Sequence, residues 1–509
     1  MLKIENKKRM IDNNVKIFKL LLILFKKFNK RRQKQIYLLF FLILASAFAE
    51  LISLLSVFPF LEIINNNGSI NDIKILNNLF SIFGLSQENN VIFVVTIIFS
   101  LTAVFAAIIK TGNLWYGNRL SALIGSDLSC ECFKRNLHQE YLQFISNNSS
   151  KLIANNSIYV NEVTDALGIT ARLFTSIIIA IFVSTFLLLF NFYTSLLAII
   201  IFLSAYLLIA KFSKKRLSRN SRVITKNNIA QVKLMKESNG SIRDLILRAN
   251  QNEYIDIYKK LDFKKRICQS QNNFIYLFPR NTIESLLLVF LALLTYFVSM
   301  NASTSSLVIP TVGTFAIGAQ KLLPYLQQAF GSWSSLIGAS SSISHVLEML
   351  EIPIQENSFT YKKSNINFKK NIRIKNLSLK YKYNENYIFQ NLNLSIKKGD
   401  IVGIIGKSGS GKSSFADVIM GLIKPTKGDI EVDGINIYDQ NQPYRYFDWR
   451  NSIIHLPQNI FLIDSTILNN IVFNAKDNID FERVKDAAKK ANIDKYIESL
   501  PHGYSTYIG

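Results

Sequence analysis

Cysteine, histidine and acidic residues are all scarce in this sequence of 509 residues. The three cysteines, Cys130, Cys132 and Cys268, are too few for a disulfide framework, and a Cys-x-Cys pair without further Cys or His nearby is a poor metal site. Asp and Glu number 35 against 59 Lys and Arg, which leaves a net charge of +24. Such a charge is typical of chains that bind nucleic acid or lie beside anionic lipid. The charge alone does not choose between these two partners.

Long apolar runs are what the sequence has in abundance. Hydrophobic residues make up 49% of the chain, and the mean hydropathy of +0.19 excludes a disordered or fibrous chain. Several runs reach the roughly 20 residues that cross a hydrocarbon core as a helix. We predict a transmembrane domain over residues 36–350 with six spans. The spans lie near 36–64, 91–109, 173–190, 194–210, 285–300 and 307–337.

Basic residues predict which way the spans face, because loops rich in Lys and Arg stay in the cytoplasm. Residues 1–35 carry twelve Lys or Arg, whereas Lys74 is the only basic residue within 65–90. The connections over 110–170 and 211–280 are long, basic and polar. We therefore predict a multi-pass protein whose N terminus and C-terminal domain are cytoplasmic. Its positive charge then faces membrane lipids and not nucleic acid.

Two shorter segments fit this topology. Residues 15–28 mix Lys with Leu and Phe at helical spacing, which predicts a helix lying in the membrane interface within the N-terminal segment 1–35. On the outer side, residues 70–85 form either a short amphipathic helix or an ordered loop.

A glycine-rich motif appears after the composition changes at Ile352-Pro353. Alternating patterns predict strands over 372–381 and 392–396, and the apolar run Ile401–Ile405 predicts a third strand that leads into the motif. The motif, G-x-x-x-x-G-K-S, comprises Gly406, Lys407, Ser408, Gly409, Ser410, Gly411, Lys412 and Ser413. Between a strand and a helix, this pattern is a phosphate-binding loop.

The residue types of the loop suit a nucleoside triphosphate. The glycines let backbone N–H groups surround phosphate oxygens, and the N terminus of the following helix adds positive partial charge. Lys412 reaches the β- and γ-phosphates, and the Ser413 hydroxyl binds Mg²⁺. The predicted nucleotide-binding residues are Gly406, Ser408, Gly409, Ser410, Gly411, Lys412, Ser413 and Ser414. The site is for ATP or GTP.

Six spans followed by a phosphate loop resemble an ABC exporter half-transporter, and the resemblance covers nearly the whole chain. It implies a six-span α-helical bundle followed by an α/β nucleotide-binding domain, here its N-terminal part over 372–509. In this family an aromatic residue stacks on adenine, and Tyr381 matches its position, with Tyr383 as a second candidate. Gln458, in Leu-Pro-Gln, resembles the glutamine that approaches Mg²⁺ and the attacking water. The resemblance implies ATP and Mg²⁺ as cofactors and a homodimer as the working unit.

The family also has a signature motif, a hydrophobic strand ending in Asp-Glu with the catalytic Glu, and a switch His. None of these three patterns occurs in the 509 residues. We therefore expect a truncated reading of a longer ATPase. If the sequence is taken literally, the alternative is a membrane protein that binds ATP without hydrolysing it.

Patterns in the membrane half narrow the resemblance. Segments around Glu50, Arg119 and Pro279-Arg280 resemble bacterial exporters similar to the PglK flippases of lipid-linked oligosaccharides and to polysaccharide exporters. This implies an ATP-driven flippase in the bacterial inner membrane that moves a lipid-linked oligosaccharide or polysaccharide precursor. The alternative is an exporter of peptides or hydrophobic small molecules.

Charged residues near or within spans are the candidates for contact with cargo, because charge is costly there. Lys110, Arg280 and Lys321 would suit a lipid pyrophosphate. The competing interpretation is that they extend to the interface or pair within the protein, as Arg280 could with Glu284.

Overall fold

The computed structural model describes residues 17–56, 60, 91–146, 149–190, 192–301, 308–354, 366–381, 386–439, 445–458, 460–473 and 479–508. The chain divides into two compact units, Met1–Gln355 and Glu356–Gly509. Among the described residues, every strand belongs to the second unit. The segment 70–85, predicted as a helix or a loop, lies outside these residues.

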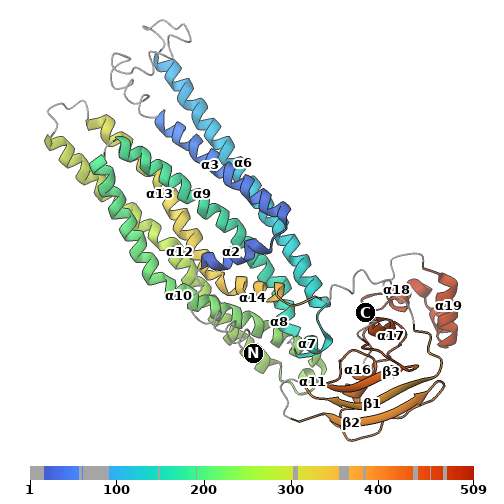
Figure 1. Ribbon diagram of the computed structural model, residues 1–509. Coiled ribbons are helices and arrows are strands. Elements are labelled where there is room, and N and C mark those ends of the chain that lie inside the picture. Colours follow the sequence, from blue (N-terminus) through green and yellow to red (C-terminus); the bar gives the residue numbers. More distant parts are fainter. Residues whose placement is uncertain are drawn as a thin grey trace. The chain divides into compact units, whose positions relative to one another are not determined.

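The first unit is a bundle of long helices (Figure 1). They are α2 (Ile17–Lys27), α3 (Lys30–Leu55), α6 (Val91–Leu137), α7 (Tyr141–Ser146), α8 (Ser149–Ala154), the π-helical turn η1 (Asn155–Tyr159), α9 (Val160–Phe190), α10 (Phe192–Gly240), α11 (Ile242–Leu247), α12 (Gln251–Asn301), α13 (Val308–Gly338) and α14 (Ser340–Leu350). With 47, 49 and 51 residues, α6, α10 and α12 are the longest. Each is about 70–75 Å long at 1.5 Å per residue. Such a helix crosses a hydrocarbon core of about 30 Å and continues well beyond it.

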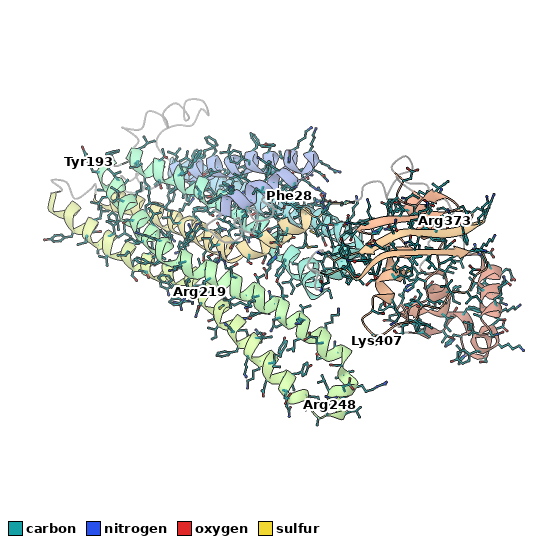
Figure 2. All side chains as sticks on the ribbon, turned by 60° about the horizontal axis from the view of Figure 1, so that its bottom comes forward. Phe28, Tyr193, Arg219, Arg248, Arg373 and Lys407 are labelled. Carbon is teal, nitrogen blue, oxygen red and sulfur yellow. The ribbon has the colours of Figure 1, made fainter. Side chains whose placement is uncertain are left out.

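Five helices of the described chain are long and apolar enough to cross a membrane. They cover Lys30–Leu55, Ile92–Leu137, Leu152–Leu189, Phe192–Gly240 and Gln251–Tyr296. The remaining predicted span, 307–337, coincides with α13. In Figure 2, Tyr193, which lies between the predicted spans 173–190 and 194–210, is at one end of the bundle, and Arg248 of the basic connection 211–280 is at the other.

The bundle is held by apolar contacts and by close helix approaches. Helix α13 packs against α9, α10 against α12, and α3 against α6. At Gly318 of α13, an added Cβ would lie 2.6 Å from the Leu187 side chain of α9, so a larger residue would have to displace that side chain. Leu24 of α2 is fully buried in the same core cluster as Met349 of α14. The apolar face of the predicted interfacial helix is therefore at least partly covered by protein.

The second unit is built on an antiparallel sheet with strand order β2-β1-β3-β4. The strands are β1 (Asn371–Leu379), β2 (Phe389–Lys397), β3 (Lys427–Val432) and β4 (Ile435–Asn436), and a short ladder joins β5 (Ser465–Thr466) to β6 (Tyr507–Ile508). The helices are α16 (Lys412–Ile419), α17 (Arg445–Asn451), α18 (Ile467–Val472), α19 (Phe481–Lys490) and α20 (Asp494–Ser499), with the short turn η3 (Gly503–Ser505). Ile374 of β1 pairs with Ile430 of β3, and both side chains are buried.

The prediction of a strand over Ile401–Ile405 is wrong for this structure. The segment belongs to neither of the two ladders that the described residues form. Ile401 and Ile405 have relative exposures of 102% and 98%. A strand is assigned only where its backbone forms hydrogen bonds with a neighbouring strand, and this apolar run has no such neighbour in the described part of the chain.

Asp433 anchors the start of β1 from the turn after β3. Its carboxylate accepts hydrogen bonds from the backbone N–H groups of Lys369, Lys370 and Asn371 at 2.8, 2.7 and 3.0 Å. Loss of hydration opposes the charged form, but the three backbone hydrogen bonds together hold the pKa of Asp433 below its ordinary value. Because folding lowers this pKa, the stabilisation is present above about pH 4 and is lost as the pH falls through the folded-state pKa.

We expect Asp433→Ala to destabilise the sheet locally by about 1 kcal/mol, because the three hydrogen bonds are partly exposed to water. Hydrogen exchange measured on β1 and β3 peptides should then be about fivefold faster at pH 7 than in the wild type. Lys375→Ala is the control, because it removes only a surface ion pair with Glu431 in the same sheet. Equal exchange in the two variants would contradict the anchoring role.

Candidate nucleotide site

The phosphate loop is formed by glycines in the left-handed region of the backbone. Gly409 and Gly411 have φ values of +80° and +93°, which L-residues with a side chain rarely adopt. Gly411 precedes the first residue of α16, and a Cβ added there would collide with the Ile388 side chain. The backbone can therefore turn tightly into α16, whose N-terminal N–H groups face the loop as an anion site requires.

Lys412 lies across the loop that it follows. Its Nζ donates hydrogen bonds to the carbonyl oxygens of Gly406 at 2.7 Å and Lys407 at 2.9 Å. These two acceptors are the first two residues of the motif and Lys412 is the seventh, so the Lys412 side chain reaches back across the loop to its start. Phosphate oxygens would offer this ammonium group negatively charged acceptors in place of neutral carbonyls. The Ser413 side chain beside it is exposed.

The far end of α16 is fixed by residues that the sequence analysis did not single out. The Trp449 indole donates a hydrogen bond to the Ile419 carbonyl at 2.8 Å, and Arg450 Nε donates one to the Gly421 carbonyl at 2.9 Å. Burial lowers the pKa of Arg450 from its ordinary value. Val418 is fully buried in the same helix. These contacts satisfy carbonyls at the helix end and hold the helix that carries Lys412.

Tyr381 lies next to the residues of the loop. Its hydroxyl is 2.9 Å from the Ser414 hydroxyl, so the structure brings these two predicted residues together. Tyr383, the second candidate, is outside the described residues. The Tyr381 side chain is therefore hydrogen-bonded to the helix that begins with Lys412.

Gln458 is exposed, and no hydrogen bond joins it to Lys412 or Ser413 among the described residues. The segment just before it nevertheless approaches α16. Burial raises the pKa of Asp417 in that helix, and the nearby His455 partly offsets the rise. The Gln458 region therefore flanks the loop helix without a direct contact to the two residues predicted to bind phosphate and metal.

Comparisons with known proteins bear on both units. Residues 389–506 match the ABC transporter family, and most of the chain superposes on a bacterial Atm1-family ABC exporter solved with ATP bound. That superposition has a TM-score of 0.72 and 14% identity, and it covers 94% of this chain and 80% of the other. The chain has the fold of an ABC exporter. Its second unit carries an ABC transporter ATP-binding domain, a family in which this domain hydrolyses ATP.

Relatives of known sequence match parts of this exporter-fold chain. A putative ABC transporter ATP-binding protein of Mycoplasma genitalium is 32% identical over 43% of the chain, and an ATP-dependent lipid A-core flippase of Pasteurella multocida is 34% identical over 32% of it. The matched regions cover 38% and 27% of these two relatives' own lengths. The five apolar helices and the ABC exporter fold together indicate a membrane protein.

Of the three cations predicted to contact cargo, Lys110 and Lys321 lie near each other through Tyr325 and Glu50, whereas Arg280 is paired on its own helix. Arg280 Nε lies 2.9 Å from Glu284 on the same helix, and Lys321 Nζ lies 3.2 Å from Glu50 on α3. Both are therefore already paired with carboxylates. Lys110 differs, because its Nζ donates a hydrogen bond of 2.9 Å to the hydroxyl of Tyr325.

We expect Tyr381→Ala to weaken ATP binding about tenfold, because an aromatic–base stack contributes about 1–3 kcal/mol. Tyr381→Phe keeps the ring and loses only the hydroxyl contact with Ser414, so its ATP affinity should stay within about threefold of the wild type. Affinity for inorganic tripolyphosphate, which has no base, should be the same in all three proteins. A matching loss of tripolyphosphate binding in Tyr381→Ala would show that the ring supports the loop and does not contact adenine.

Proposed function

We propose that this protein is an ATP-driven exporter or flippase that moves a lipid-linked oligosaccharide or polysaccharide precursor across the bacterial inner membrane. The observation that carries the proposal is the presence, in one chain with an ABC exporter fold, of a formed phosphate loop and five helices able to cross a membrane. In this topology the N terminus and the nucleotide-binding unit are cytoplasmic. A flippase among the relatives favours a lipid cargo over a soluble peptide.

ATP and Mg²⁺ are the cofactors of the proposal. Lys412 and the backbone N–H groups of the loop would hold the β- and γ-phosphates, and the Ser413 hydroxyl would bind Mg²⁺. Gln458 would reach the metal after a movement of its segment, since it is exposed and makes no contact with the loop in this structure. The residues present fit the group, because the loop glycines, the ammonium group and the hydroxyl offer the required donors and ligand.

The working unit in this proposal is a homodimer. One chain supplies one phosphate loop and one bundle, and a closed two-fold assembly of two identical chains is the simplest way to enclose a translocation path. ATP binding would draw the two nucleotide-binding units together, and hydrolysis would release them.

The proposal is tested by a transport assay in proteoliposomes that contain the protein of the native gene. A fluorescent lipid-linked oligosaccharide with a short prenyl chain should move across the bilayer when ATP and Mg²⁺ are present and should stay in place when either is omitted. A fluorescent hydrophobic peptide is the competing cargo. ATP-dependent transport of the peptide alone would replace the lipid cargo, and the absence of ATP-dependent movement of either would refute the function.

A further inference from the structure

We propose that Lys110 and Arg172 bind the phosphate group of the cargo at a cavity between α6, α9 and α13. This inference rests on the proposed function and deepens it, because it names the chemistry by which the bundle recognises its cargo: a phosphate or pyrophosphate head joined to a lipid. Arg172 was not among the residues that the sequence analysis selected.

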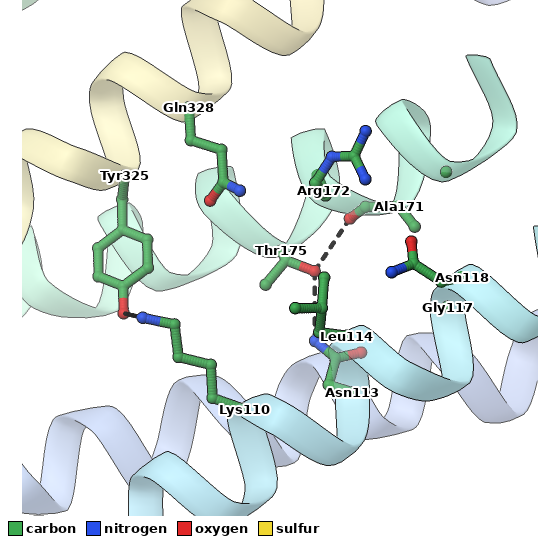
Figure 3. A pocket seen from close by; sticks show the side chains of 11 residues that line it. Lys110, Asn113, Leu114, Gly117, Asn118, Ala171, Arg172, Thr175, Tyr325 and Gln328 are labelled. Atoms are coloured by element: carbon green, nitrogen blue, oxygen red, sulfur yellow. Dashed lines mark hydrogen bonds between the residues drawn. The ribbon is translucent and has the colours of Figure 1, made fainter. Parts of the chain in front are cut away.

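The cavity has a volume of about 100 Å³, and its mostly apolar wall is lined by eleven residues, seven of which carry polar or charged side chains (Figure 3). Two cations, three carboxamides and two hydroxyls contribute to the lining, and none of its residues is acidic. The cations and the carboxamides are Lys110, Arg172, Asn113, Asn118 and Gln328. A lining with this charge and these hydrogen-bond donors fits an anion.

Neither cation forms an ion pair with a described residue, although the Tyr325 hydroxyl that Lys110 contacts also lies near Glu50, the partner of Lys321. Lys110 donates to the neutral Tyr325 hydroxyl at 2.9 Å and also lies 4.8 Å from the centre of that ring. Arg172 forms no ion pair and no side-chain hydrogen bond with any described residue. Both cations are therefore able to form charge-assisted hydrogen bonds with a negatively charged ligand.

A glycine leaves room between the donors. A Cβ added at Gly168 would lie 3.8 Å from a terminal nitrogen of Arg172 and 3.9 Å from the side-chain oxygen of Asn118. In Figure 3 these two side chains approach each other from α9 and α6, and Gln328 extends toward the same space from α13. Side chains from three helices therefore line one cavity, with Lys110 at Tyr325 and Arg172 near Asn118.

The size and the position of the cavity favour a phosphate head over a sugar. A cavity of about 150 Å³ holds a benzene ring, so about 100 Å³ admits a group smaller than a sugar ring. Lys110 directly follows the apolar run 91–109, and Arg172 directly precedes the run 173–190. In the proposed topology both are at the cytoplasmic ends of their spans, at the depth of the inner-leaflet headgroups. Lys110 and Asn118 are exposed on α6, which leaves the cavity open on that side.

The test is a binding measurement that does not require hydrolysis. The full chain in phosphatidylcholine nanodiscs is titrated calorimetrically with farnesyl pyrophosphate, with farnesol and with inorganic pyrophosphate. We expect farnesyl pyrophosphate to bind best, and Lys110→Gln and Arg172→Gln each to weaken it at least tenfold. Arg172→Lys should recover most of the affinity. Lys211→Gln is the matched control, because Lys211 is an exposed cation that directly follows the apolar run 194–210 and does not line the cavity.

Binding of ATP to every variant separates this inference from the proposed function. If the Gln variants retain ATP and bind farnesyl pyrophosphate as the wild type does, the phosphate site is refuted while the exporter proposal stands. If the wild type binds inorganic pyrophosphate or farnesol as tightly as farnesyl pyrophosphate, the assignment to a lipid-linked phosphate is overturned. If farnesyl pyrophosphate binding depends on both cations but the wild type binds no ATP, the site stands and the ATP-driven function fails.

Discussion

Replacing Lys412 with Ala should reduce the affinity of the purified protein for ATP at least about 100-fold, equivalent to about 2.7 kcal/mol. The ammonium group already accounts for two hydrogen bonds across the loop, to Gly406 and Lys407, and with nucleotide bound it would face two phosphates. Charge-assisted hydrogen bonds are the strong ones, and no other described side chain donates to these loop carbonyls. Titration with a fluorescent ATP analogue measures the loss.

Lys407→Ala is the matched control for this experiment. Lys407 belongs to the same loop and carries the same charge, but its side chain is exposed and only its backbone carbonyl contacts Lys412. Its removal should change ATP affinity by less than about threefold. If both substitutions weakened ATP binding equally, the effect would come from the net charge of the loop and not from the position of Lys412. The thermal stability of both variants should stay close to that of the wild type, because the two hydrogen bonds that Lys412→Ala removes are exposed to water.

The phosphate loop could be predicted from the sequence because its geometry is local. The positive φ values of Gly409 and Gly411 and the start of α16 at Lys412 all follow from eight consecutive residues. The contact of Tyr381 with Ser414 spans 33 residues, and a resemblance, not a local rule, drew attention to Tyr381. The strand predicted over Ile401–Ile405 failed because sheet membership depends on a neighbouring strand, which an apolar pattern does not specify.

Charge pairing in the bundle could not be read from the sequence. Lys321 and Glu50 meet although they lie on α13 and α3, so the sequence left Lys321 as a candidate for contact with cargo. Only the pair of Arg280 with Glu284, four residues apart on one helix, follows from spacing. Arg172 was overlooked because it directly precedes an apolar run and resembled an ordinary flanking charge. That Arg172 and Lys110 line the same cavity depends on how α6, α9 and α13 pack.

Replacing Lys321 with Met should destabilise the bundle by about 3–5 kcal/mol, because it leaves a buried carboxylate without its cation. Glu50 has a side-chain exposure of 12% and lies 3.2 Å from Lys321 Nζ, which also donates to the Ser53 hydroxyl at 3.2 Å. Tyr325 near Glu50 is neutral, and Lys110, which donates to the Tyr325 hydroxyl, forms no ion pair with Glu50. Thermal unfolding of the detergent-solubilised protein, followed by tryptophan fluorescence, measures the change.

The double variant Glu50→Gln/Lys321→Met should recover most of the lost stability, because both charges are then absent. Arg280→Met is the control: it breaks an ion pair with the same kind of partner, but the Arg280 side chain is 64% exposed, so the cost should stay below about 1 kcal/mol. If Lys321→Met were as stable as Arg280→Met, the ion pair between Glu50 and Lys321 would have no structural role. If Lys321→Met is strongly destabilised and the double variant regains stability, the role of Lys321 is to pair with Glu50. Of Lys110, Arg172, Arg280 and Lys321, only Lys110 and Arg172 would then remain as candidates for contact with cargo.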